Sequence, residues 1–327
     1  MKNYEILNSI QHSKSLCIIG HISPDTDALS TMVILKEFII KYFNIPIVDL
    51  FAEGFNPSSD YYSEIVGNEI INPQQQTYET AIMVDSPNLE RIGIYKDLFL
   101  GAHQKIIIDH HATNSFVGNI NIVEMCSSTC EIVYSILKEF KYKLSKSNQG
   151  KLYAGIITDT NNFTVGNFGK RTFKIASQIC SNIKTTLIYN HFLANTTLRQ
   201  MQLIAIALNN LTSFEHGQII ISHITTQDLD KYNARPDDCS VIINKLATIS
   251  GNKLVCFIYP KENQLYVSMR AKGNLDISQI AKQNGGGGHK GAAAYLSTKP
   301  LLEIEKYTLK KFSSLLENHK ETTQKLF

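Results

Sequence analysis

Residues 105–111 read Lys-Ile-Ile-Ile-Asp-His-His, and the other segments of the chain can be placed around this one. Three consecutive isoleucines are too few for a helix and are typical of a buried strand. The strand breaks directly into Asp109, His110 and His111. Ligands bind at the carboxyl ends of strands in open α/β sheets, so these side chains lie where chemistry is expected. A lone Asp-His pair is more often a simple strand end, and the interpretation therefore needs support from other strands.

The first half of the chain alternates short apolar runs with segments of helical periodicity. Apolar runs predict further strands at residues 15–20, 46–51, 80–85 and 119–124. Helical spacing is present at residues 28–43, 152–158, 172–183 and 197–211, and Ser128 to Glu131 is a capping-box sequence that begins another helix. Such alternation predicts an α/β fold with a doubly wound, mainly parallel sheet.

A different pattern begins near His216. It predicts strands at 218–224, 253–259 and 264–270, helices at 237–249, 276–283 and 301–317, and a Gly-rich loop. Two of these strands are joined by a short turn, so the sheet should be mixed or antiparallel. We therefore expect a first domain over 1–192, a helical connector over 193–215 and a smaller α/β domain over 216–327, with the active-site cleft between the two domains.

The composition of the chain indicates which classes of partner and environment are expected. Hydrophobic residues make up 43% and charged residues 19%, which is globular, and the net charge of +3 includes no Lys/Arg block. A long nucleic-acid duplex is therefore not the expected partner, whereas a short anionic ligand is. The six cysteines are scattered and are expected to be free thiols. We see no secretion leader and no apolar window long enough for a membrane span, so we expect a cytoplasmic protein without membrane contact.

Acidic residues recur at the ends of the predicted strands and helices. They are Asp25, Asp27, Asp85, Asp109 and Asp159, accompanied by His21, His110 and His111. Each could be a helix cap or a turn residue when considered alone. Four carboxylates at one sheet edge would repel one another unless cations lie between them. Carboxylates and imidazoles without a thiolate favour manganese or magnesium over structural zinc. A two-metal site of this kind is suited to hydrolysis of phosphoesters or phosphoanhydrides.

These residues lie in motifs that resemble a known family. GHISPDTDALS (20–30), MVDSP (83–87), IIIDHH (106–111) and ITDT (157–160) resemble, in this order, the four motifs of the DHH phosphoesterase superfamily. GGGGHKGAAA (285–294) resembles the signature of the DHH-associated domain in its oligoribonuclease and phosphoadenosine-phosphate phosphatase branch. The chain departs from the family pattern at Thr26, Asn161 and Ala294, where the family usually has glycine. None of these departures removes a ligand.

The resemblance implies roles for individual residues. One metal would be held by His21, Asp25 and Asp85, and the other by Asp27, Asp85, His110 and Asp159. His111 would face the substrate phosphate as a catalytic residue, with Asp109 orienting a histidine. The implied cofactors are two divalent ions, Mn²⁺ in the first place, with Mg²⁺ or Co²⁺ also compatible.

The second domain is expected to bind the end of the substrate that is remote from the scissile bond. Its residues, by the same resemblance, are Arg270, His289, Gly286, Gly287 and Gly288, with Ser268 as a weaker candidate. Taken alone, the glycines would be a flexible linker and Arg270 a surface residue. Arg171 is either a further phosphate contact or a surface arginine at a helix start.

The resemblance implies the leading hypothesis, a manganese-dependent phosphoesterase and exoribonuclease that degrades RNA dimers to pentamers and removes the phosphate of adenosine 3′,5′-bisphosphate. A rival enzyme is a stand-alone phosphodiesterase of cyclic or linear dinucleotides; an inorganic pyrophosphatase ranks lower because its second domain lacks the Gly-His signature. A rival from another class is a nucleic-acid-binding module without catalysis. A homodimer is compatible with each of these.

Overall fold

The protein divides into two compact units, residues 1–195 and 196–327. In this computed structural model the described residues are 10–55, 60–67, 69 and 77–324, and the side chains at 60, 61, 289 and 319–324 lie outside the description. The first unit contains a five-stranded sheet and the second a six-stranded sheet.

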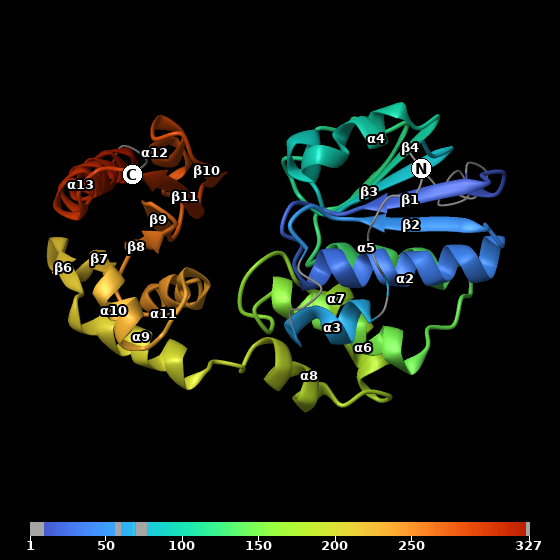
Figure 1. Ribbon diagram of the computed structural model, residues 1–327, viewed down its shortest axis with the longest axis horizontal. Coiled ribbons are helices and arrows are strands. Elements are labelled where there is room, and N and C mark those ends of the chain that lie inside the picture. The colour runs from blue at the N-terminus through green and yellow to red at the C-terminus, as the bar shows by residue number, and fades with distance from the viewer. Residues whose placement is uncertain (1–9, 56–59, 68, 70–76, 325–327) are drawn as a thin grey trace. The chain divides into compact units, whose positions relative to one another are not determined.

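All neighbouring strands of the first sheet are parallel, in the order β2-β1-β3-β4-β5 (Figure 1). The strands are β1 (Ser15–Ile19), β2 (Ile47–Phe51), β3 (Thr80–Val84), β4 (Gln104–Asp109) and β5 (Ile120–Val123). This order is that of a doubly wound sheet whose direction of winding reverses between β1 and β3. The predicted parallel α/β fold is confirmed, and the reversal point marks the sheet edge where ligands of such folds bind.

Helices cover both faces of this sheet. Ile106 and Ile108 of β4 lie in the core formed with α2 (Thr26–Phe43), α5 (Thr129–Glu139), α6 (Lys146–Asp159) and α7 (Lys170–Cys180). Ile107 lies on the opposite face, against the 3₁₀ helix η1 (Leu89–Tyr95) and α4 (Lys96–Gly101). Burial on both faces explains why β4 is a continuous apolar run and not an alternating one.

The structure also shows elements that the sequence patterns did not predict. In this unit they are η1, α4, α3 (Asp60–Val66) and α8 (Thr185–Phe192). Helix α6 starts at Lys146, earlier than the predicted residue 152, because the Ser145 side chain caps it by accepting a hydrogen bond from the Asn148 N–H. Its first turn is polar, so apolar periodicity alone did not reveal it.

The second sheet is mixed, as predicted, in the order β10-β11-β9-β8-β7-β6. Its strands are β6 (Thr212–Phe214), β7 (Ile219–His223), β8 (Leu254–Lys261), β9 (Gln264–Ala271), β10 (Gly287–His289) and β11 (Ala292–Ser297). Strands β7 and β8 are parallel and the other neighbours are antiparallel. Part of the predicted Gly-rich loop is therefore the edge strand β10, paired with β11.

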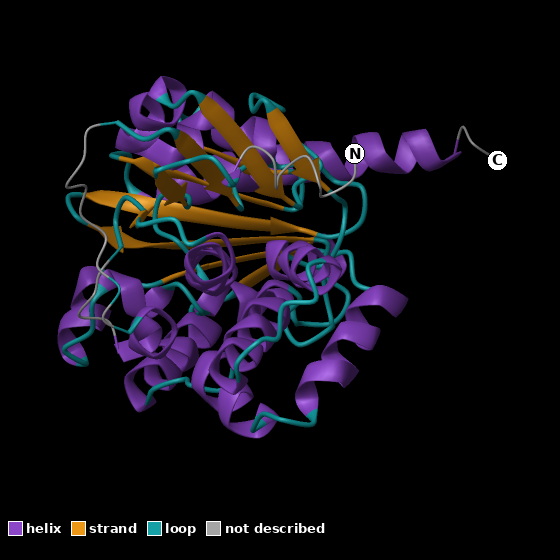
Figure 2. Cartoon of the chain, turned by 90° about the vertical axis from the view of Figure 1, so that its right-hand side faces the viewer, coloured by secondary structure: helices purple, strands orange, loops and turns teal. Residues whose placement is uncertain are grey.

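Two helical layers enclose this sheet. One contains α9 (Leu198–Asn209), α10 (Thr226–Lys231), the 3₁₀ helix η3 (Pro236–Cys239) and α11 (Ile242–Ala247); the other contains α12 (Ser278–Gln283) and α13 (Leu301–Gln324). The last turns of α13 lead to the C-terminus (Figure 2). The helix predicted over 237–249 is split between η3 and α11. Helix α9, within the segment predicted as a connector, buries Leu203 and Ala207 in the second unit's core.

Among the described helices, none combines the length and the apolar character needed to cross a bilayer.

Candidate metal centre and anion site

The candidate ligands come from the carboxyl ends of three strands and from two helices. His21 follows β1, Asp85 follows β3, and His110 follows β4. Asp25 and Asp27 lie at the start of α2, and Asp159 is the last residue of α6. The structure brings all six together in two groups of three, in each of which the potential ligand atoms lie within 4.8 Å of one another.

The first group contains His21, Asp25 and Asp85. The Nε2 atom of His21 lies 3.8 Å from Oδ2 of Asp25 and 3.7 Å from Oδ2 of Asp85. Asp25 is also the N-cap of α2, because its Oδ1 accepts a hydrogen bond from the Ala28 N–H at 3.0 Å. One oxygen of Asp25 thus satisfies the helix while the other faces His21.

The second group contains Asp27, His110 and Asp159. The Nε2 atom of His110 lies 3.3 Å from Oδ2 of Asp159 and 3.4 Å from Oδ1 of Asp85. Asp85 therefore turns one carboxylate oxygen to each group, Oδ2 to His21 and Oδ1 to His110. Its backbone lies in the left-handed region at a φ of 51°, which aspartate tolerates better than most residues. Its placement is that of a residue shared by two cation sites.

The donor set fits two divalent cations. His21 and His110 each direct Nδ1 at a backbone carbonyl, that of Ile22 at 2.9 Å and that of Cys126 at 3.3 Å. With the proton on Nδ1, each Nε2 presents a lone pair to the carboxylates, which is the usual outer-shell arrangement of metal-binding histidines. Oxygen and imidazole donors without a thiolate are the ligands of Mg²⁺- and Mn²⁺-type sites.

The pKa shifts in the metal-free chain reflect the crowding of charge. Burial, and then the charge of Asp85, raise the pKa of Asp27 to about 7, while burial and Asp27 raise that of Asp159 to about 8. Burial disfavours the imidazolium forms, but Asp25 raises the pKa of His21 to about 9, and Asp85 raises that of His110 to about 10. Protons thus compensate the carboxylates where cations would otherwise do so.

Asp109 and His111 lie beside the two groups. Asp109 is fully buried, and its carboxylate accepts from Nδ1 of His111 at 2.7 Å and from Nδ2 of Asn114 at 2.6 Å. Although burial opposes its charge, these hydrogen bonds lower the pKa of Asp109. His111 also forms a group of potential ligands with Asp85 and His110. The catalytic role of His111 and the orienting role of Asp109 stay predictions.

The start of α5 and η1 lie against this centre and contact it in ways that the sequence motifs did not predict. The backbone N–H groups of Thr129 and Cys130 donate to the two oxygens of Asp27, at 2.7 and 3.0 Å. The Thr129 hydroxyl donates to Oδ1 of Asp85 at 3.0 Å. Arg91 places Nη2 3.3 Å from Nδ1 of His21, but a Nδ1 that donates to the Ile22 carbonyl cannot also accept from the guanidinium, so Arg91 is a neighbour of this imidazole and not its hydrogen-bond donor. The sequence signal for α5 was the capping box, but nothing in it indicated these partners.

Arg171, for which two roles were open, forms ion pairs within the first unit. Its guanidinium contacts Glu124, and its Nε lies 3.2 Å from Oε1 of Glu131. Glu131 is buried and also accepts hydrogen bonds from Ser127 and Thr172. Arg171 is therefore engaged in holding α7 to α5. The Glu131 side chain is occupied by this network, whereas the Ser128 side chain accepts from the Glu131 N–H as a cap.

In the second unit, four of the predicted anion-binding residues, Ser268, Arg270, Gly287 and His289, occupy adjacent rows of one sheet face, whereas Gly288 lies in the intervening row and Gly286 precedes β10. Ser268 of β9 is opposite Ala294 of β11, which in turn is opposite Gly287 of β10. The next row contains Arg270, Ala292 and His289. Directly opposed residues of antiparallel strands share a face, so the register places these positions together. The side chain of His289 lies outside the described part of the structure, and its role stays a prediction.

Arg270 is held without an acidic partner among the described residues. Its Nε donates to Oδ1 of Asn244 on α11 at 3.2 Å, and its Nη1 donates to the Met269 carbonyl at 3.0 Å. Burial lowers the pKa of Arg270. A half-buried guanidinium fixed by two neutral acceptors keeps its charge available for an anion.

Packing against β11 requires glycine at positions 286 and 288 but not at position 287. A Cβ atom at Gly286 would lie 2.1 Å from the Ala294 carbonyl oxygen, and one at Gly288, where φ is 136°, would lie 2.4 Å from that of Ala292. Pairing of β10 with β11 therefore requires glycine at both positions. A Cβ atom at Gly287 would meet nothing within 4 Å. Gly287 is thus not explained by packing within the chain, and its binding role stays a prediction.

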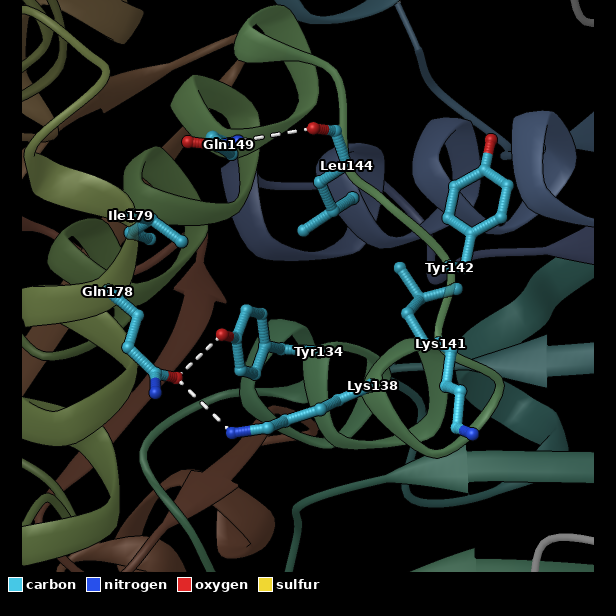
Figure 3. A pocket seen from close by; sticks show the side chains of 9 residues that line it. Tyr134, Lys138, Lys141, Tyr142, Leu144, Gln149, Gln178 and Ile179 are labelled. Atoms are coloured by element: carbon cyan, nitrogen blue, oxygen red, sulfur yellow. Dashed lines mark hydrogen bonds between the residues drawn. The ribbon is translucent and has the colours of Figure 1, made fainter.

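A pocket of about 240 Å³ at the C-terminal end of α5 is separate from these residues (Figure 3). It is lined by Lys138, Lys141 and Tyr142, and Gln178 accepts a hydrogen bond from the Tyr134 hydroxyl at 2.7 Å. None of the candidate ligands lines it. Lysines near a helix C-terminus are explained by the helix dipole, so we assign it no role.

Comparison with known proteins agrees with this geometry. Residues 15–158 match the DHH family, N-terminal domain, and residues 216–318 match the DHHA1 domain. The bifunctional oligoribonuclease and PAP phosphatase NrnA of Bacillus subtilis is 27% identical over 302 residues, 89% of this chain and 93% of that protein. The cyclic-di-AMP phosphodiesterase PdeA of Listeria monocytogenes is 25% identical, over 91% of this chain but only 47% of that protein.

A solved structure shares the fold. An exopolyphosphatase-related protein from Bacteroides fragilis superposes with a TM-score of 0.85 at 21% identity, covering 98% of this chain and 96% of that one. The two domain matches occur in the order of the two units, and the first includes nearly all the candidate ligands. The chain belongs to the DHH family of metal-dependent phosphoesterases and carries the DHHA1 domain.

Proposed function

We propose that the protein is a manganese-dependent phosphoesterase of short nucleotides, which hydrolyses RNA dimers to pentamers to mononucleotides and adenosine 3′,5′-bisphosphate to AMP. The observation that carries the proposal is the position of Asp85, whose two oxygens face two separate groups of potential ligands. The match to NrnA over 89% of the chain supports the substrate class.

Each side chain then has a defined task. His21, Asp25 and Asp85 would hold one cation, and Asp27, Asp85, His110 and Asp159 the other. When bound, two divalent ions supply Lewis acidity for water activation and for neutralising phosphoryl oxygens. Asp109, bonded to Nδ1 of His111, keeps that imidazole oriented so that it can contact the substrate phosphate. In the reaction, water forms the new P–O bond and the leaving oxygen departs as an alcohol.

The second unit would select short substrates through a second phosphate. Arg270 would bind a phosphate remote from the scissile bond, with His289, Ser268 and the N–H groups of Gly286 to Gly288 as further contacts. The absence of an acid partner for Arg270 among the described residues supports this role. Two phosphates of one molecule are present in dinucleotides and in nucleoside bisphosphates, but not in a nucleoside monophosphate.

A second candidate is hydrolysis of cyclic or linear dinucleotides, which the match to PdeA favours. Both candidates use the same chemistry and differ only in the preferred substrate.

The test is incubation of the purified chain and Mn²⁺ with labelled RNA dimers to pentamers, adenosine 3′,5′-bisphosphate, a cyclic dinucleotide and pyrophosphate. We expect mononucleotides from the short RNAs and AMP from the bisphosphate. Asp85→Asn should lower the rates by roughly 1,000-fold or more, because it removes the carboxylate shared by both groups. Cleavage of the cyclic dinucleotide alone would support the second candidate, and phosphate from pyrophosphate alone would contradict both. No product at all would favour a non-catalytic nucleic-acid-binding module.

A further inference from the structure

Thr129 is the first residue of α5 and is fully buried, yet it belongs to neither group of candidate ligands. Its backbone N–H donates to Oδ2 of Asp27 at 2.7 Å. Its hydroxyl donates to Oδ1 of Asp85 at 3.0 Å. One residue therefore contacts two neighbouring carboxylates that the proposed function assigns to the metal centre.

The two carboxylates depend on Thr129 to different degrees. Asp27 is held at both oxygens by backbone N–H groups, those of Thr129 and Cys130, so its orientation does not require the threonine side chain. Asp85 receives the Thr129 hydroxyl at Oδ1, the oxygen that also lies 3.4 Å from Nε2 of His110. Among the hydrogen bonds of the described residues, this hydroxyl is the one side-chain donor to Asp85 that is not an imidazole.

The orientation of Asp85 determines what it can do. With its present orientation, Oδ1 faces His110 and Oδ2 faces His21. Rotation of the carboxylate about its Cβ–Cγ bond would take each oxygen away from the group that it faces. A hydrogen bond to Oδ1 from a rigid donor opposes that rotation, and a β-branched side chain at the start of a helix has few alternative rotamers.

The helix itself has no need of this hydroxyl. Ser128 is the N-cap of α5, and its side-chain oxygen accepts the Glu131 N–H at 3.3 Å. The capping function is thus fulfilled by the preceding residue, and an apolar residue would be acceptable at position 129 for helix formation alone.

We propose that Thr129 is a positioning residue of the metal centre, whose hydroxyl fixes the Asp85 carboxylate so that one oxygen faces each cation site. This inference rests on the proposed function, since it assumes that Asp85 binds metal. Hydrogen-bonding partners of ligating carboxylates typically contribute about 10-fold to 100-fold to metal affinity.

The test compares Mn²⁺ binding by the full chain and three variants, measured by isothermal titration calorimetry and by the electron paramagnetic resonance signal of free Mn²⁺. Thr129→Val keeps the shape but removes the hydroxyl, and should weaken binding by about 10-fold to 100-fold. Thr129→Ser keeps the hydroxyl and should remain within about 3-fold of the unaltered chain. Ser128→Ala removes the cap of the same helix; it should lower the unfolding temperature of the metal-free protein while leaving Mn²⁺ affinity within the same limit.

Equal Mn²⁺ affinity of Thr129→Val and the unaltered chain would overturn the inference, as would equal losses in Thr129→Ser and Thr129→Val. If Thr129→Val does not fold, Thr129→Ala, which places no methyl group against Asp85, takes its place with the same expectation. If the unaltered chain itself binds no Mn²⁺, the proposed metal centre fails. If the unaltered chain binds Mn²⁺ and Thr129→Val binds it equally well, only the role of Thr129 fails.

Discussion

In the first unit, Asp25, Asp27, Asp85 and Asp159 meet around two imidazoles at one edge of a parallel sheet. In the second unit, Arg270 lies half-buried on a sheet face and is held by the amide oxygen of Asn244 and a backbone carbonyl. In the first site, crowded carboxylates are compensated by protons on the carboxyl and imidazole groups, and in the second a cation has no carboxylate partner among the described residues. Stability explains neither arrangement, because crowding carboxylates in a buried site and burying an unpaired cation both cost folding free energy.

The difference indicates what each site is suited to bind. Carboxylates that hold protons at neutral pH release those protons when divalent cations bind. A guanidinium that is held by neutral acceptors has its positive charge free to bind a phosphate. A short nucleotide with two phosphates needs both functions, one for the phosphate that reacts and one for the phosphate that is only held.

Among changes to the second site, the largest effect should follow from removing its cation. Arg270→Ala should raise KM for an RNA dinucleotide with a terminal phosphate by about 10-fold to 100-fold, since a charged hydrogen bond contributes about 1.5–3 kcal/mol. The kcat value should change by less than about 3-fold, because the proposed function assigns the reacting phosphate to the metal centre and not to Arg270. Steady-state kinetics measures both constants.

Arg270→Lys serves as the control, because it keeps the charge but not the planar fork, and its KM should be intermediate. A fall in kcat at constant KM would place Arg270 at the reacting phosphate. No change in either constant would show that Arg270 does not contact the substrate.

A smaller effect should follow from giving the second site the acid that it lacks. Asn244→Asp would place a carboxylate at the position that now lies 3.2 Å from Nε of Arg270. The resulting ion pair competes with the substrate phosphate, and KM should rise about 5-fold to 10-fold, equivalent to about 1 kcal/mol. Asn244→Ala removes the same hydrogen bond without adding charge and should raise KM less. A higher KM for Asn244→Ala than for Asn244→Asp would contradict the idea that an acid at this position competes with the substrate phosphate for Arg270.

The smallest expected effect is the change in stability of the metal-free protein with pH. The pKa values of Asp27, Asp159, His21 and His110 are raised to about 7, 8, 9 and 10. Between its unfolded and folded pKa each group binds more protons in the folded chain, so the free energy of unfolding falls as pH rises. The lowered pKa values of Asp25 and Asp109 act below about pH 4. From pH 6.5 to 9 the unfolding temperature in EDTA should therefore fall, by about 2–8 °C.

Differential scanning fluorimetry at several pH values measures this fall. Over the same range Mn²⁺ affinity should rise, because metal binding displaces the same protons. Asp159→Asn removes one titrating group and should make the unfolding temperature less dependent on pH. An unfolding temperature that stays constant or rises with pH would contradict the assignment of shared protons to the acid cluster.

Much of the fold was accessible from local patterns. The isoleucines of β4 predicted a buried strand, and the structure covers it on both faces. The mixed sheet followed from the short turn between β8 and β9, which lie antiparallel. Short elements were not predicted where local patterns are weak, and α4 is an example because it has few residues. The apolar pattern over 237–249 predicted one continuous helix, although the structure has two separate elements there, η3 and α11.

For the candidate site, the types of side chain and their positions at strand ends could be predicted from the sequence, because each motif is contiguous and the ends of parallel strands share one edge. Which atoms face one another was not predictable in this way, because it depends on the packing of distant segments. Thr129 meets Asp85 and Asp27 from 44 and 102 positions away, and Arg171 meets Glu124 from 47 positions away. Such contacts depend on how α5 and α7 pack on the sheet. That packing is set by the whole core and leaves no signal in the residues next to Thr129 or Arg171.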